Sequence, residues 1–160
     1  MASGKDEVIM SEISGGCACR AVHYMAKGNP LFMVNCHCRD CQKSTGAAYA
    51  PLLAFSLPLV WWSGHLHFYE TVGGSGRVVR RGFCPNCGNP VAIEPAVGKS
   101  IQAIYAATLD DPSLHQPTQD IFTDSAQPWD HMDPATLKAP GRMVREPKMV
   151  QPESTNCAEP

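Results

Sequence analysis

The sequence predicts a small, mainly β domain with little helix, held together by metal-binding cysteines. No stretch of the 160 residues keeps a 3.6-residue apolar period, so the helix content should be low. Fourteen prolines and 13 glycines indicate many turns between short elements. Seven of the eight cysteines fall into three tight clusters, a layout that is typical of metal coordination.

Short alternating segments predict the strands in order along the chain. Residues 19–27 alternate polar and apolar side chains and should form a strand, which the Gly-Asn-Pro sequence at 28–30 ends. Residues 39–44 should form one helical turn that ends at Gly46. The glycine-rich sequence at 73–76 predicts a hairpin loop. The remaining strands are expected over 31–34, 47–55, 59–62, 65–71, 77–83, 90–94 and 100–109.

One domain is expected over residues 13–139, between two flexible ends. A chain of 17.3 kDa has the size of one domain. Residues 1–12 form a poorly specified lead-in, and residues 140–160 hold prolines, lysines and glutamates with few apolar side chains. Such segments bury too little apolar surface to offset the entropy cost of ordering. Cys157 lies in the second of them and is expected to be a free thiol.

The composition argues against nucleic-acid and membrane partners. A formal charge of −2 and a pI near 6.3 give no general attraction to nucleic acid or to an anionic membrane. The first ten residues include Lys5, Asp6 and Glu7 and lack the apolar region of a secretory signal, and no run of 18 apolar residues could span a bilayer. We therefore expect a cytoplasmic protein, and in a reducing compartment clustered cysteines favour metal over disulfide bonds.

Two cysteine pairs predict a structural zinc site. Each pair supplies two thiolates from one tight turn, which is half of a tetrahedral site, so each pair needs a partner pair. The predicted ligands are Cys17, Cys19, Cys84 and Cys87. Gly88, after the second pair, is expected to let backbone N–H groups approach the sulfurs without a Cβ clash.

The remaining cluster predicts a second, open zinc site. Cys36, Cys38 and Cys41 can surround one ion by themselves, and three protein ligands leave one position free for water or substrate. A thiol that enters this position would be deprotonated and held as a nucleophile. The alternative is a closed site with a histidine as fourth ligand. His37 is nearest in sequence, but its place between two cysteines predicts that its side chain points away from the ion. The other candidates are His23, His65, His67 and His115.

Several ordered motifs resemble one known family. They are GGCAC (15–19), CHCRDC (36–41), STGAA (44–48), FCPNCG (83–88), LDDP (109–112) and AQPW (126–129). Over about residues 13–140 the chain is similar to the glutathione-dependent formaldehyde-activating enzyme family, which includes centromere protein V. Two positions depart from the family pattern: Arg20 stands where glycine is common, and Asp120 where a histidine is expected.

The resemblance implies a β-tent of the Mss4-like type, built of short antiparallel strands and stapled by two zinc ions per chain. It implies the same division of the cysteines, into a structural group of four and a catalytic group of three. The implied reaction joins formaldehyde to glutathione and is classed with the carbon–sulfur lyases.

The roles of the basic residues are less clearly indicated by the sequence. Arg39 and Lys43 flank the three-cysteine cluster and could receive the carboxylates of glutathione, or could be ordinary surface charges. Arg77, Arg80 and Arg81 share one predicted strand, with Arg80 on the opposite face, and are interpreted as edge-strand charges.

The aromatic residues are kept out of the predicted site. Tyr49 and Tyr105 could donate to a developing alkoxide, but nothing in the sequence places them near the cysteines. The three tryptophans are expected to serve packing.

The sequence therefore predicts a zinc enzyme of carbon–sulfur chemistry. A thiol, plausibly glutathione, would add to formaldehyde or another small carbonyl at the three-cysteine site. Two alternatives remain at this point: a non-enzymatic, zinc-stapled module that binds a protein partner, and a thiolate–zinc redox sensor.

Overall fold

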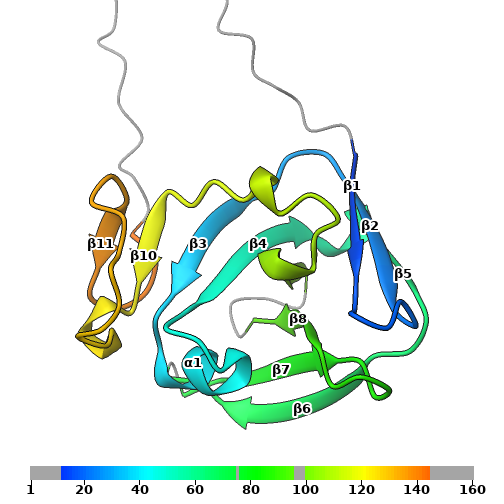
Figure 1. The fold of residues 1–160 in the computed structure, drawn as a ribbon, viewed down its shortest axis with the longest axis horizontal. Coiled ribbons are helices and arrows are strands. Elements are labelled where there is room, and N and C mark those ends of the chain that lie inside the picture. The colour runs from blue at the N-terminus through cyan, green and yellow to red at the C-terminus, as the bar shows by residue number, and fades with distance from the viewer. Residues whose placement is uncertain (1–11, 75, 96–99, 145–160) are drawn as a thin grey trace, which may run out of the picture.

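The computed structural model describes residues 12–74, 76–95 and 100–144 and confirms a mainly β fold. In this described part, eleven strands form two sheets and one α-helix accompanies them (Figure 1). The small sheet has the order β1-β2-β5, and the large sheet has the order β11-β10-β3-β4-β9-β8-β7-β6. No helix among these residues is long and apolar enough to cross a membrane.

The bounds of the elements follow the chain. The strands are β1 (Glu12–Gly16), β2 (His23–Lys27), β3 (Phe32–Cys36), β4 (Ala50–Ser56), β5 (Val60–Ser63), β6 (His67–Val72), β7 (Val78–Phe83), β8 (Pro90–Glu94), β9 (Ile101–Tyr105), β10 (Gln119–Ile121) and β11 (Leu137–Ala139). The helix is α1 (Arg39–Thr45), and the short 3₁₀ turns are η1 (Leu57–Leu59), η2 (Ala106–Thr108), η3 (Pro112–Leu114) and η4 (Thr123–Ser125).

Three strands differ from the sequence prediction. β1 was not predicted, because no strand was expected before residue 19, and it pairs antiparallel with β2. β10 and β11 were not predicted, because β10 buries Gln119 and Asp120 rather than an alternating apolar face. β10 also pairs in parallel with both β3 and β11, so the ladders are not all antiparallel.

The ends that we expected to be flexible, residues 1–12 and 140–160, fall largely outside the described residues. Residues 1–11 and 145–160, including Cys157, are not described. The part of the C-terminal segment that is described follows β11. There the Gly141 carbonyl accepts a hydrogen bond of 2.6 Å from the Phe122 backbone N–H.

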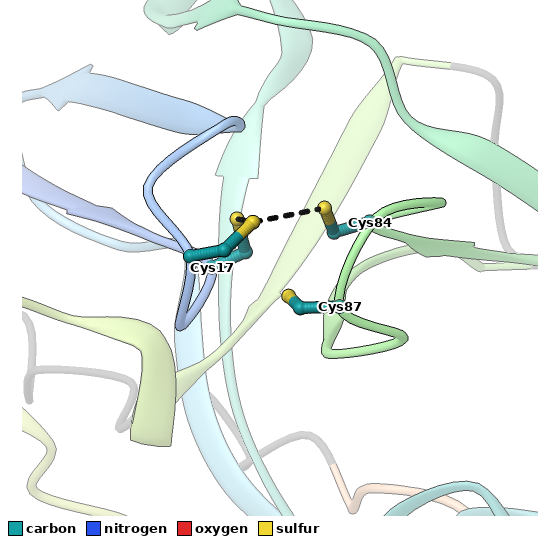
Figure 2. A group of neighbouring side chains, drawn as sticks. Cys17, Cys84 and Cys87 are labelled. Carbon is teal, nitrogen blue, oxygen red and sulfur yellow. Dashed lines mark hydrogen bonds between the residues drawn. The ribbon is translucent and has the colours of Figure 1, made fainter.

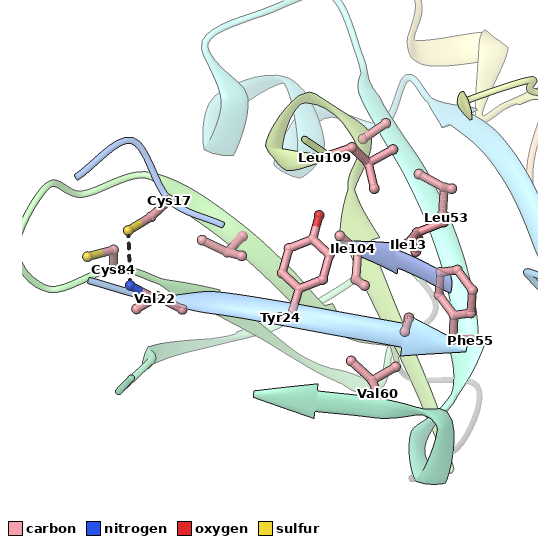
Figure 3. Packing of buried hydrophobic residues seen from close by; sticks show 13 residues of the cluster. Ile13, Cys17, Val22, Tyr24, Leu53, Phe55, Val60, Cys84, Ile104 and Leu109 are labelled. Carbon is pink, nitrogen blue, oxygen red and sulfur yellow. Dashed lines mark hydrogen bonds between the residues drawn. The ribbon is translucent and has the colours of Figure 1, made fainter. Parts of the chain in front are cut away.

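The two faces of β4 separate two apolar clusters. Leu53 and Phe55 point toward the small sheet and pack with Tyr24 and Val60, as Figure 3 shows. Leu52, on the other face of β4, belongs to the second cluster, which includes Cys36 and Cys41. The alternation of a strand thus gives the large sheet one face for the core and one for a site.

Gly15 shows how closely the core is packed beside the first cysteine pair. A Cβ placed there would lie 2.2 Å from the Thr108 carbonyl oxygen and 2.3 Å from the Tyr24 hydroxyl oxygen. The same two residues also contact one another through their side chains, since the Tyr24 and Thr108 hydroxyls are 3.0 Å apart. Only glycine fits at this position, which accounts for one residue of the GGCAC motif.

Candidate metal centres and the adjoining cavity

The four cysteines predicted as one site lie together, although they come from two distant turns. Cys17 and Cys19 follow β1, and Cys84 and Cys87 follow β7. Their sulfurs all lie within 4.8 Å of one another. Figure 2 shows the sulfurs of Cys17, Cys84 and Cys87 turned toward a common centre.

The geometry of this group fits a tetrahedral zinc ion. The Cys19 sulfur is 3.6 Å from the Cys17 sulfur and 3.7 Å from the Cys84 sulfur. Zinc–sulfur bonds of about 2.3 Å in a tetrahedron place the sulfurs about 3.8 Å apart. Cys17 and Cys84 are buried, whereas Cys19 and Cys87 are exposed.

Backbone and side-chain N–H groups stabilise thiolates in this group. The Asn86 side-chain amide donates to the Cys19 sulfur at 3.2 Å and, with the backbone N–H of Ala21, lowers the pKa of Cys19 to about 6. The backbone N–H of Val22 donates to the Cys17 sulfur at 3.3 Å. Hydrogen bonds of this kind are typical around metal-bound sulfur.

The reason for Gly88 is different from the one we predicted from sequence. Its φ of +73° lies in the left-handed region, and no atom lies within 4 Å of a Cβ built there. The knuckle therefore needs glycine for its backbone conformation and not to avoid a Cβ clash. The Gly88 N–H closes the turn with a 2.8 Å hydrogen bond to the Cys84 carbonyl.

The other three cysteines meet where β3 passes into α1. Cys36 ends β3, Cys38 is the N-cap of α1, and Cys41 lies in the first turn of that helix. Their sulfurs are within 4.8 Å of one another, and within the described residues no further Cys, His, Asp or Glu joins them. The Cys38 sulfur caps the helix by accepting a 3.4 Å hydrogen bond from the Cys41 N–H. Because the cap residue is itself a member of the cluster, the start of α1 is fixed to the three cysteines.

The charges in this group favour the thiolate of Cys38. Hydrogen bonds from the Cys36 and Cys41 side chains hold the pKa of Cys38 well below its usual range, and the Arg81 guanidinium contributes in the same direction. The donor set of three thiols, one of them stabilised as thiolate, fits a soft divalent ion such as zinc.

His37 does not join its neighbouring cysteines. Its ring is fully buried and points away from them, with Nε2 2.9 Å from an Asp120 oxygen and Nδ1 2.9 Å from an Asp130 oxygen. Asp120 in turn accepts from Asn35 at 3.1 Å. Nε2 is hydrogen-bonded to Asp120, whereas Nδ1 lies close to Asp130 without making a hydrogen bond. The remaining histidines also lie outside both cysteine groups in the described structure.

A cavity of about 800 Å³ opens beside the three-cysteine group. Its walls come from the face of the large sheet that carries Leu52, from α1 and from the segment after β10. Most lining side chains are apolar, for example Phe32, Ile93 and Phe122. The three cysteines are among the residues that line this cavity.

The basic residues near the cysteines differ from the prediction. Arg39 lines the cavity, but Lys43 does not. Arg77 and Arg81 of the β7 segment do line it. The interpretation of Arg77, Arg80 and Arg81 as edge-strand charges was wrong, because β7 lies between β6 and β8 in the sheet. No sequence signal could have shown this, since it depends on how the strands are ordered.

Tyr105 lies closer to the cysteines than the sequence indicated. It is buried in the same cluster as Cys36 and Cys41, and its hydroxyl is 3.2 Å from the Ser44 hydroxyl. Burial, followed by the nearby Cys41 and Cys36 charges, raises the pKa of Tyr105 to about 12. Tyr105 does not line the cavity, so its contribution is to pack behind the cysteines in the apolar cluster. Of the tryptophans, Trp62 packs on the core, while Trp61 and Trp129 are exposed.

Comparisons with known proteins agree with this arrangement. The family model described as glutathione-dependent formaldehyde-activating enzyme matches residues 12–125. A crystal structure of a Rhodobacter sphaeroides protein from a structural genomics programme is similar in fold, with a TM-score of 0.51 and 20% sequence identity. The match covers 65% of this chain and 96% of that one. No curated protein gives a significant match. Because the family model spans most of the chain and both cysteine groups, this protein belongs to the glutathione-dependent formaldehyde-activating enzyme family.

Proposed function

We propose that this protein is a zinc-dependent enzyme of the carbon–sulfur lyase type that adds a thiol to a small carbonyl compound, with glutathione and formaldehyde as the plausible pair. One observation supports this proposal above all: three cysteines that could bind a metal ion line a cavity. Within the described residues no fourth ligand completes the group, so a substrate sulfur could.

The two cysteine groups would have different tasks. Cys17, Cys19, Cys84 and Cys87 would hold a structural zinc ion. Cys36, Cys38 and Cys41 would hold the second ion, which would supply the Lewis acidity that deprotonates a coordinating substrate thiol.

The reaction needs little from the chain beyond positioning. The sulfur forms a bond to the carbonyl carbon, the C=O double bond becomes a C–O single bond, and the thiol proton ends on that oxygen as a hydroxyl. The reverse reaction breaks the same C–S bond. Most of the cavity wall is apolar, which would strengthen the electrostatic interactions around a bound sulfur.

His37 would position the ligands rather than react. It is fully buried and hydrogen-bonded to Asp120, and it lies between Cys36 and Cys38 in the chain. This fixes the backbone that presents both cysteines. We place the protein in the cytoplasm, where the seven described cysteines, all free thiols here, would stay reduced.

The test combines metal analysis with a reaction assay. Wild-type protein and Cys38→Ser are compared for zinc content, for glutathione binding by calorimetry and for the rate at which glutathione consumes formaldehyde above the spontaneous rate. Cys157→Ser is the matched control, because it removes one cysteine outside both groups.

We expect two zinc ions, glutathione binding and rate acceleration in wild type and in Cys157→Ser. Cys38→Ser should keep one zinc and lose binding and acceleration. Two zinc ions with no glutathione binding in wild type would contradict the proposal and favour a protein-binding module.

A further inference from the structure

Basic side chains surround the cavity in a chain whose net charge is −2. Four arginines line it: Arg39, Arg77, Arg81 and Arg142. Among the described lining residues, Asp40 is the one acidic side chain. A concave apolar site with an excess of positive charge concentrates anionic ligands.

The alternation along β7 divides its arginines between two environments. Arg81 and Val79 point into the cavity. Arg80, between them, points to the opposite face, where it lies 2.6 Å from a Glu94 oxygen and 3.1 Å from a Glu70 oxygen. Arg80 is therefore neutralised by acidic partners of the protein itself.

Arg81 has no such partner. One of its terminal nitrogens donates to the Thr71 hydroxyl at 2.7 Å. Its Nε is buried and makes no hydrogen bond, and no ion pair involves Arg81 in the described part of the chain. Buried donors are nearly always paired, and a guanidinium presents its N–H groups as a fork that fits a carboxylate.

The sheet places Arg81 at a fixed position relative to the three cysteines. Arg81 pairs with Ile93 of β8, and Ile93 pairs with Ala103 of β9, so an apolar strip runs across the sheet from the guanidinium. All three residues line the cavity together with the cysteines.

We infer that Arg81 forms a carboxylate subsite that makes the site selective for thiols carrying a carboxylate at a distance from the sulfur. This inference rests on the proposed function, because it assigns the sulfur end of the substrate to Cys36, Cys38 and Cys41. Arg81 is then a specificity-determining residue. A neutral thiol of similar size fits the cavity but leaves the guanidinium unpaired.

The test uses ligands that cannot react through sulfur. S-methylglutathione keeps both carboxylates and has no thiol proton, and its dimethyl ester lacks both carboxylates. Calorimetry measures the Kd of each for wild type, Arg81→Gln, Arg81→Lys and Arg80→Gln. The last is the matched control, an arginine of the same strand on the opposite face. Zinc content is measured for each variant to show that both cysteine groups are intact.

We expect wild type and Arg80→Gln to bind S-methylglutathione at least about tenfold more tightly than its ester, the ratio typical of one charge-assisted hydrogen bond. Arg81→Gln should remove this preference, and Arg81→Lys should restore part of it. Equal binding of the two ligands by wild type would overturn the inference, as would an equal loss for both in Arg81→Gln.

Failure of the proposed function has a different signature. In that case S-methylglutathione still distinguishes Arg81→Gln from wild type, but glutathione and formaldehyde show no accelerated reaction. Conversely, the wild type could accelerate the reaction of glutathione with formaldehyde and still bind S-methylglutathione and its dimethyl ester equally. That result would support the proposed function and refute the carboxylate subsite.

Discussion

Arg20 carries backbone strain next to the four-cysteine group. Its φ is +66°, in the left-handed region that favours glycine, and the family pattern often has glycine there. Arg20 instead forms a 2.8 Å ion pair with Asp110, both side chains being substantially exposed. Exposed ion pairs of this kind contribute little, so the pair offsets the strain only in part.

Two substitutions at Arg20 separate these effects. Arg20→Gly and Arg20→Ala both remove the ion pair. Glycine adopts the left-handed conformation without strain, whereas alanine does not. We expect the alanine variant to be less stable than the glycine variant by about 1 kcal/mol. Urea unfolding with zinc present measures the difference. Equal stabilities would show that the conformation costs nothing.

Asp120 is a buried carboxylate that accepts hydrogen bonds from several side chains. Burial alone raises the pKa of Asp120, but hydrogen bonds from Thr136, His37, Lys138 and Asn35 outweigh it and lower the pKa to about 2. Because the pKa in the folded state is below the ordinary value of about 3.9, the ionised group stabilises the fold above pH 4. This stabilisation is lost as the pH falls from about 4 to 2.

Asp120→Asn should therefore cost the protein stability mainly at neutral pH. We expect a loss of about 1–3 kcal/mol at pH 7 that shrinks as the pH approaches 2. Denaturant unfolding at a series of pH values measures the free energy of unfolding of both proteins. Zinc release at low pH affects both, so it cancels in the difference between them. A difference that stays constant with pH would contradict the ionised state.

α1 connects the three-cysteine group to the C-terminal part of the chain through Gln42. This buried side chain donates to the His37 carbonyl at 2.6 Å and to the Ser125 carbonyl at 2.9 Å. Ser125 belongs to η4, which is more than 80 residues further along the chain. The amide thus holds two segments against the backbone between Cys36 and Cys38.

Gln42→Glu tests this connection with little change in shape. The carboxylate places an oxygen against two carbonyl oxygens, so we expect about 2 kcal/mol of destabilisation and weaker retention of the second zinc. Gln116→Glu, at an exposed position, serves as the control for the added charge. Zinc content after dialysis and urea unfolding are the measurements. Full retention of two zinc ions at wild-type stability would refute this role.

The predictable elements are those that depend on local spacing. The cysteine knuckles, the helical turn at 39–44 and most strands follow from residues close together in sequence, and the family from its ordered motifs. β10 was missed because its buried Asp120 is satisfied by residues such as His37, 83 positions away. The cavity and the direction of Arg81 depend on strand order in the sheet, which no local pattern records.

At the scale of the whole molecule, the four-cysteine group joins the small sheet to the turn after β7. Cys17 and Cys84 are also buried members of the core that packs between the sheets. Structural zinc in small domains can contribute on the order of 10–16 kcal/mol of apparent binding free energy, as much as the stability of a whole domain. The three-cysteine group, in contrast, lies in a cavity wall.

Loss of the two groups should therefore have different effects on folding. We expect Cys84→Ser to abolish cooperative unfolding or lower stability by several kcal/mol, and Cys38→Ser to remain folded. Circular dichroism and thermal unfolding compare the two. The assignment fails if the Cys84→Ser protein unfolds at the wild-type temperature.

A thiol titration of the cobalt(II)-substituted protein shows whether the three-cysteine group is open to a substrate sulfur. Cobalt in thiolate sites absorbs light according to the number of bound sulfurs. The account predicts that one equivalent of glutathione per chain adds sulfur-to-cobalt charge-transfer absorbance in wild type. Cys38→Ser, with cobalt held only by the four-cysteine group, should show no change. A wild-type spectrum that glutathione leaves unaltered at saturation would contradict an open thiol site at Cys36, Cys38 and Cys41.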